Sequence, residues 1–97
     1  MIPAEFHPAA QADLLAAIEF YEGRAPGLGR AFLLEAERTA ALLQQFPAIG
    51  PVVDGDLRRF WFNRFPYSYL YRLPGECVRI LAVAHHKQKP GHGFDRR

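Results

Sequence analysis

Cysteine is almost absent from this chain of 97 residues, which contains only Cys77. A single cysteine excludes an internal disulfide and leaves no pair of thiolates for a metal ion, so a reducing compartment is favoured. Long hydrophobic runs are absent as well. No apolar stretch approaches the roughly 20 residues that cross a membrane, and the N-terminus has no basic-then-apolar signal segment. These absences predict a cytoplasmic protein with no membrane partner.

Serine is equally scarce, and this limits the covalent chemistry available to the chain. Ser68 is the only serine and lies within a predicted strand, which does not suit the exposed nucleophile of a catalytic triad. His85 and His86 are adjacent, so on a strand they point to opposite faces, and no cysteine or carboxylate stands at ligand spacing beside them. The glycine-rich segment 23–29 follows a helix and lacks the lysine of a phosphate-binding loop. We therefore expect neither a metal ion nor another cofactor.

The first half of the chain has few basic residues and the second half has few acidic ones, although the net charge is only +2. Residues 1–50 carry three basic and six acidic side chains, whereas residues 51–97 carry nine basic and four acidic ones. The C-terminal half is therefore a basic surface suited to an acidic partner, such as nucleic acid or an acidic protein segment. The length suits one domain, residues 1–97, which buries roughly 60–70% of its unfolded surface.

Periodicity predicts an α+β domain, with an N-terminal strand and an antiparallel helical hairpin packed on one face of an antiparallel β-sheet. Pro8 suits the first turn of a helix, and Pro47 ends a second helix. The last strand is apolar on both faces, which predicts a central place in the sheet, and the basic tail after it is expected to be loosely structured. The predicted helices cover residues 8–23 and 28–46, and the predicted strands cover residues 2–6, 57–62, 67–73 and 77–85.

The apolar stripes of the helices predict how the hairpin meets the sheet. We expect one stripe to pack on one face of the strands and to bury Ile80, leaving the other face free for aromatic rings and arginines. The helix stripe comprises Leu14, Ile18, Phe32, Ala36 and Leu43, and the strand residues beneath it are Phe60 or Phe62, Leu70, Ile80 and Ala82.

Residues 60–71, FWFNRFPYSYLY, hold more than half of the aromatic side chains, and arginines stand among and beside them. By composition alone three interpretations stay open: core rings with a rim of solvated arginines, an RNA-binding surface, or a protein interface. The candidate binding residues are basic or aromatic, and they are Arg59, Trp61, Arg64, Tyr71, Arg72, His85, His86, Lys87 and Lys89.

Two motifs, RFPYSYLYR at residues 64–72 and ILAVAHHKQKP at residues 80–90, follow the helical pair in a characteristic order. With them, nearly the whole chain from Ala12 to Arg97 resembles the RelE/ParE superfamily of toxins from type II toxin–antitoxin modules. The resemblance implies a helical hairpin on an antiparallel sheet whose other face meets the target. It also implies a cognate antitoxin, acidic and partly disordered, that wraps the toxin and blocks it, and the candidate residues are expected to bind either the target or this antitoxin.

The superfamily has two activities, and two positions of this sequence indicate which of them to expect. One branch consists of ribosome-dependent mRNA endonucleases, and the other resembles ParE, which inhibits DNA gyrase without a nuclease centre. Ser68 falls where the nucleases carry an arginine, and the tail offers Phe94 where they carry a tyrosine. We therefore expect a growth-inhibiting toxin that binds DNA gyrase. The alternatives are a nuclease acting at the ribosome through His86, Arg64 and Arg59, or a non-toxic module that still binds the antitoxin.

Overall fold

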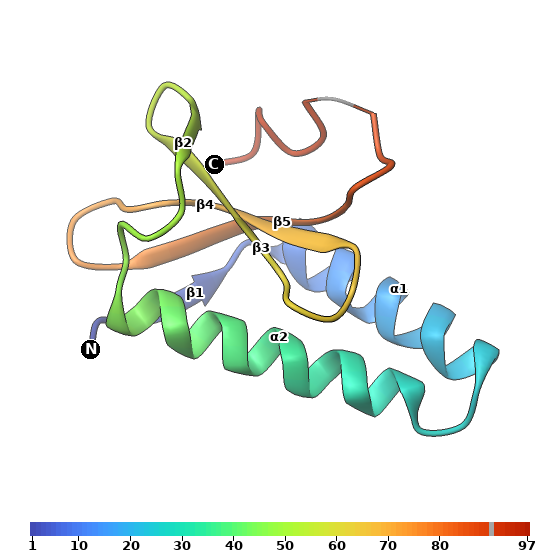
Figure 1. Ribbon diagram of the computed structural model, residues 1–97. Helices are drawn as coiled ribbons and strands as arrows, with labels where there is room; N and C mark the ends of the chain where they lie inside the picture. The colour runs from blue at the N-terminus through green and yellow to red at the C-terminus, as the bar shows by residue number, and fades with distance from the viewer. Residues whose placement is uncertain (90) are drawn as a thin grey trace.

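In the computed structural model, which describes residues 1–89 and 91–97, two helices cover one face of a five-stranded sheet (Figure 1). The strand order is β1-β5-β4-β3-β2. The face under the helices is called the helix face here, and the opposite one the second face. The strands are β1 (Ala4–Phe6), β2 (Val52–Asp54), β3 (Leu57–Trp61), β4 (Tyr67–Arg72) and β5 (Val78–His85), and the helices are α1 (Pro8–Arg24) and α2 (Leu28–Gln45).

The predicted α+β class is confirmed, and so is the inner position of β5, which lies between β1 and β4. Strands β3, β4 and β5 form the expected antiparallel meander. The sheet as a whole is mixed, because β1 pairs with β5 in parallel. Alternation along a strand shows which face each side chain takes and not which strand it pairs with or in which direction, so this parallel pairing cannot be read from the sequence. The short strand β2, which extends the sheet beyond β3, was not expected.

The two helices are joined by a tight turn that depends on glycine. Gly27 precedes α2 with a φ of 84°, in the left-handed region that favours glycine. The Glu22 carboxylate on α1 accepts hydrogen bonds from the backbone N–H groups of Gly27 and Gly29, so α1 caps the start of α2. A Cβ on Gly29 would lie 2.8 Å from the carbonyl oxygen of Ile18, which shows how closely the two helices approach.

The main core lies between the helices and the helix face. Phe32 and Leu43 of α2 are fully buried there, as is Ile80 of β5, which confirms the predicted burial of Ile80 beneath the helices. Tyr69 of β4 donates from its hydroxyl to the Ala36 carbonyl oxygen at 2.7 Å, and burial raises the pKa of this tyrosine. Most of the aromatic segment therefore belongs to the core.

The prediction that Leu70 and Ala82 lie beneath the helices was wrong. Leu70 pairs with Ala82, whereas the next residue, Tyr71, pairs with Ile80, so the ladder contains a bulge at Leu81. Leu81 and Ala82 consequently both lie in a smaller cluster on the second face, together with Leu70. For Leu70 simple alternation is the reason, since its neighbour Tyr71 faces the helices.

The second face is partly covered by the tail (residues 86–89 and 91–97), drawn from orange to red on the side away from the helices in Figure 1. Phe94 packs on the smaller cluster of the second face. Arg96 Nη1 donates to Asp13 Oδ2 on α1 at 2.7 Å and to the Leu81 carbonyl oxygen at 3.0 Å. The structure thus corrects two predictions: the tail is not loose, and the second face is not entirely free. The motif that ends at Pro90 reaches one residue outside the described part of the chain.

Candidate functional site

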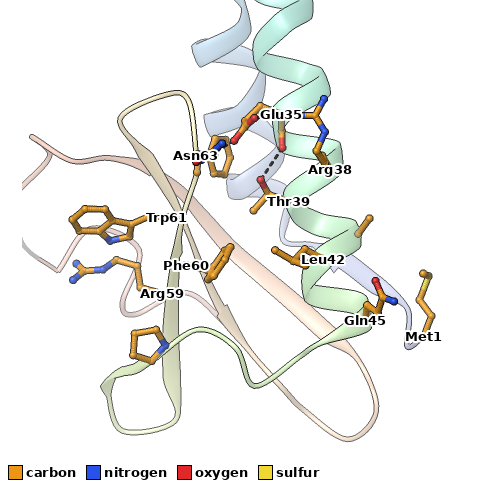
Figure 2. A pocket seen from close by; sticks show the side chains of 13 residues that line it. Met1, Glu35, Arg38, Thr39, Leu42, Gln45, Arg59, Phe60, Trp61 and Asn63 are labelled. Carbon is orange, nitrogen blue, oxygen red and sulfur yellow. Dashed lines mark hydrogen bonds and ion pairs between the residues drawn. The ribbon is translucent and has the colours of Figure 1, made fainter.

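A groove of about 1050 Å³ runs between α2 and β3, and it is called the α2–β3 groove here. Figure 2 shows Phe60 and Leu42 on its inner side, between the strand and the helix, while Arg59 and Trp61 project to the other side of β3. Arg38 lies farther along α2. Alternation along β3 explains this arrangement, since neighbouring side chains of a strand leave opposite faces. The groove therefore combines an apolar interior with basic side chains.

A buried carboxylate anchors one end of the α2–β3 groove. Glu35 is only 5% exposed, and its Oε2 accepts hydrogen bonds from the backbone N–H groups of Asn63, at 2.7 Å, and Arg64, at 3.3 Å. Its Oε1 accepts from Arg38 Nη1 at 3.3 Å. Through these hydrogen bonds, Glu35 holds the turn after β3 against α2. Sequence reasoning missed it, although it lies one turn from Phe32 on the buried stripe, where a charged residue is rarely found without partners.

In the described part of the chain, the edge of β3 is open beside this groove. Strand β2 pairs with Leu57 and Arg58, and the backbone N–H of Arg59 then donates to the Pro51 carbonyl oxygen at 3.1 Å. Alternation turns the backbone of Trp61 toward the same edge, and β2 does not extend that far. An extended peptide could add to the sheet at this point.

A second hollow, of about 360 Å³, lies on the second face between β3, β4 and the tail, and it is called the basic cleft here. It is lined by basic, aromatic and hydroxyl side chains, and no carboxylate stands among the described residues that line it. Arg59 and Trp61 line both the groove and the cleft. The lining residues with polar or aromatic side chains are Arg59, Trp61, Ser68, His85, His86, Gln88, Lys89, His92 and Phe94.

The side chains around Trp61 contact one another. The indole ring is 4.5 Å from the imidazole of His86, centroid to centroid, and the guanidinium carbon of Arg59 lies 6.0 Å from the indole centroid. His86 Nε2 is 3.2 Å from Ser68 Oγ, and the backbone N–H of His86 donates to the Pro66 carbonyl oxygen. Ser68 is 1% exposed, so it forms the floor of the cleft.

The structure brings five of the predicted binding residues to the basic cleft and places the other four elsewhere. Arg64 lies on the exposed turn after β3, with its guanidinium over the Phe65 ring, and Lys87 is exposed on the turn after β5. Arg72, at the far end of β4, pairs with Asp56 and donates from Nη2 to the Phe94 carbonyl oxygen at 3.3 Å. The five in the cleft are Arg59, Trp61, His85, His86 and Lys89.

Tyr71 is the predicted binding residue that the structure corrects. It is fully buried on the helix face, and burial raises the pKa of its hydroxyl. That hydroxyl donates to the Pro47 carbonyl oxygen at 2.7 Å and accepts from the Gly50 N–H at 3.0 Å. Tyr71 therefore holds the connection between α2 and β2 in place and is not available on a surface.

Neither helix in the described residues is apolar and long enough to cross a membrane. Within residues 1–89 and 91–97, no group of three histidine, cysteine or carboxylate side chains converges on one point.

Comparison with known proteins places this geometry in a family. The model of the family described as "ParE toxin of type II toxin-antitoxin system, parDE" matches residues 4–90. No curated protein matches the chain. Among the solved structures, a chain from "Chromosomal ParDE TA system from P. aeruginosa" is 24% identical with a TM-score of 0.78, covering 88% of this chain and 96% of that one. That likeness shows the same fold. By the family match, the chain belongs to the ParE toxins of type II toxin–antitoxin systems.

Proposed function

We propose that this ParE toxin inhibits growth in the cytoplasm by binding DNA gyrase through the surface around the basic cleft. We further propose that an acidic, partly disordered antitoxin segment neutralises it by lying in the α2–β3 groove. Arg59 and Trp61 line both sites, and their side chains project toward the cleft, so a segment in the groove would lie directly beside the target-binding surface. Steric overlap between this segment and the target offers a direct physical route to neutralisation.

The environment of Ser68 is the observation that supports binding over RNA cleavage. In the nucleases that the chain resembles, an arginine is expected at this position to balance the charge that builds up on the phosphate. Ser68 is neutral and buried, and its hydroxyl contacts His86. Loss of one charge-stabilising donor typically lowers a rate by about 10²–10³. A nuclease built on His86, Arg59 and Arg64 alone would be feeble.

The test is to induce the toxin without an antitoxin and to compare plasmid topology with primer-extension maps of translated mRNA. We expect relaxed plasmid or trapped cleavage complexes, and intact transcripts. Codon-dependent cuts in mRNA that disappear in His86→Ala would overturn the gyrase proposal and support the nuclease. Normal growth with normally folded toxin would instead indicate a module that binds an antitoxin without harming the host.

The α2–β3 groove suits the antitoxin because it offers three kinds of contact. Phe60 and Leu42 provide apolar surface, Arg38 and Arg59 attract acidic side chains, and the open edge at Trp61 can pair with an extended backbone. A disordered acidic segment could satisfy all three as it orders on the toxin.

Binding of the product of the neighbouring reading frame tests this assignment. Phe60→Ala should weaken the complex, whereas Phe46→Ala removes an exposed phenylalanine that does not line the groove and should leave the affinity nearly unchanged. The affinity should also fall as salt rises, because screening acts over about 10 Å at 0.1 M ionic strength. Equal affinities for the two variants would remove the groove as the antitoxin site.

A further inference from the structure

We propose that the basic cleft binds a single nucleotide unit, with the base on the Trp61 ring and the phosphate between Arg59 and Lys89. This inference rests on the cleft itself and not on the choice of gyrase as the target. The shared chemistry is an anionic phosphate attached to a flat aromatic base, which a free mononucleotide and an unpaired nucleotide in a single strand both supply.

Charge around the cleft selects an anion. Arg59 and Lys89 stand at its wall with three histidines, and no carboxylate is found among its described lining residues. The carboxylate of Asp13 lies close to one of these histidines, with 3.7 Å between Asp13 Oδ2 and His92 Nε2. That oxygen already accepts hydrogen bonds from Arg96, at 2.7 Å, and from the backbone N–H of Val83. The cleft therefore keeps a positive potential for a ligand.

Trp61 supplies an exposed aromatic surface on which an unpaired base can stack. It is 59% exposed, although large aromatic side chains are mostly buried in folded proteins. His86 stands 4.5 Å away on one side, and Arg59 lies over the ring system, so the indole is held in position. An ordered, exposed ring beside an arginine is how proteins receive unpaired bases. Duplex DNA would not fit this surface, because the faces of its bases are stacked on one another.

The size of the cleft matches a small ligand. The volume of about 360 Å³ lies at the small end of the roughly 300–1,000 Å³ typical of ligand sites, which suits one nucleotide unit.

Trp61 is the only tryptophan, so intrinsic fluorescence reports on the cleft directly. Purified toxin would be titrated with AMP, with adenosine, with inorganic phosphate and with a short single-stranded oligo(dA). AMP should quench the emission saturably and bind more tightly than adenosine or phosphate alone. Oligo(dA) binding about tenfold or more above AMP would identify a single strand as the source, and equal affinities would identify a free nucleotide.

The variants assign the binding to the cleft. Arg59→Ala should weaken AMP binding by about tenfold or more, the value of a charge-assisted contact. Arg24→Ala removes an arginine at the end of α1, over the Phe20 ring and outside the cleft, and should bind as the parent does. Circular dichroism would verify that both variants fold. No saturable quenching by AMP or oligo(dA), phosphate binding as tightly as AMP, or equal losses in the two variants would each overturn the proposal. None of these outcomes bears on gyrase inhibition, which is measured in cells.

Discussion

The two faces of the sheet differ in how they are covered, although they are made by the same strands. On the helix face, Phe32, Tyr69 and Ile80 are fully buried beneath two long helices. On the second face, a small apolar cluster lies under the tail, whose described residues form no helix or strand, beside the open basic cleft. Adjacent residues of β3 show the contrast, since Phe60 packs against the core whereas Trp61 is 59% exposed.

This contrast shows how a domain of 97 residues keeps a closed core on one face of a sheet and an open basic surface on the other. The helix face is closed by regular elements, so its side chains can pack tightly and specify the fold. The second face is covered only in part, which leaves rings and cations exposed beside the cleft. Alternation along a strand allows both, because each substitution on one face leaves the other nearly unchanged.

The largest expected effect is a loss of stability that differs between the two apolar clusters. Ile80→Ala should lower the free energy of unfolding by about 2–5 kcal/mol, because the rigid helices cannot close the cavity. Leu70→Ala, on the second face, should cost less, since the tail above it can settle into the space. Urea denaturation of both variants provides the measurement. Equal losses would show that the two faces are equally rigid.

A smaller loss is expected from a hydrogen bond on the helix face. Tyr71→Phe should cost about 1–3 kcal/mol, because the buried Gly50 N–H loses its acceptor. Tyr69→Phe is the matched control and should cost less, since the Ala36 carbonyl oxygen that it releases lies within α2 and keeps its helical partner. Thermal unfolding of the pair checks the order, and a larger loss in Tyr69→Phe would contradict it.

The next largest loss of stability is expected where the tail is attached to α1. Arg96→Ala should cost about 1–2 kcal/mol, between the values for exposed and buried charged hydrogen bonds, because Arg96 is partly buried against Asp13. Amide exchange should speed up mainly in the tail and at the end of β5. Arg97→Ala removes the exposed neighbouring arginine and should leave exchange unchanged. Uniform acceleration across the sheet would mean that the two faces unfold together.

The smallest effect is expected at the exposed ring. Trp61→Phe should change the stability by no more than about 0.5 kcal/mol, because the indole is largely solvent-exposed. Chemical denaturation followed by circular dichroism measures this without the tryptophan signal. A loss as large as that of Ile80→Ala would place Trp61 in the core and contradict the difference between the two faces.

Much of the fold could be predicted because its signals are local. The spacing of Phe32, Ala36 and Leu43 reports a helix face wherever the helix packs, and the alternation around Ile80 reports a strand. The candidate site was predicted less well. Tyr71 has the composition of a binding residue but lies in the core, and the partners of Glu35 are backbone groups that no composition reveals.

By itself, the sequence determined the helices, four of the five strands, the buried stripe and the basic character of the C-terminal half. Only the tertiary structure decided which faces Leu70 and Ala82 occupy, and that the tail closes on the sheet. The bulge in β5 reverses the alternation on which a local reading depends. Asp13 and Arg96, 83 residues apart, meet because of the path of the whole chain. Local periodicity specifies the elements, whereas register and long-range contacts depend on all of them packing together.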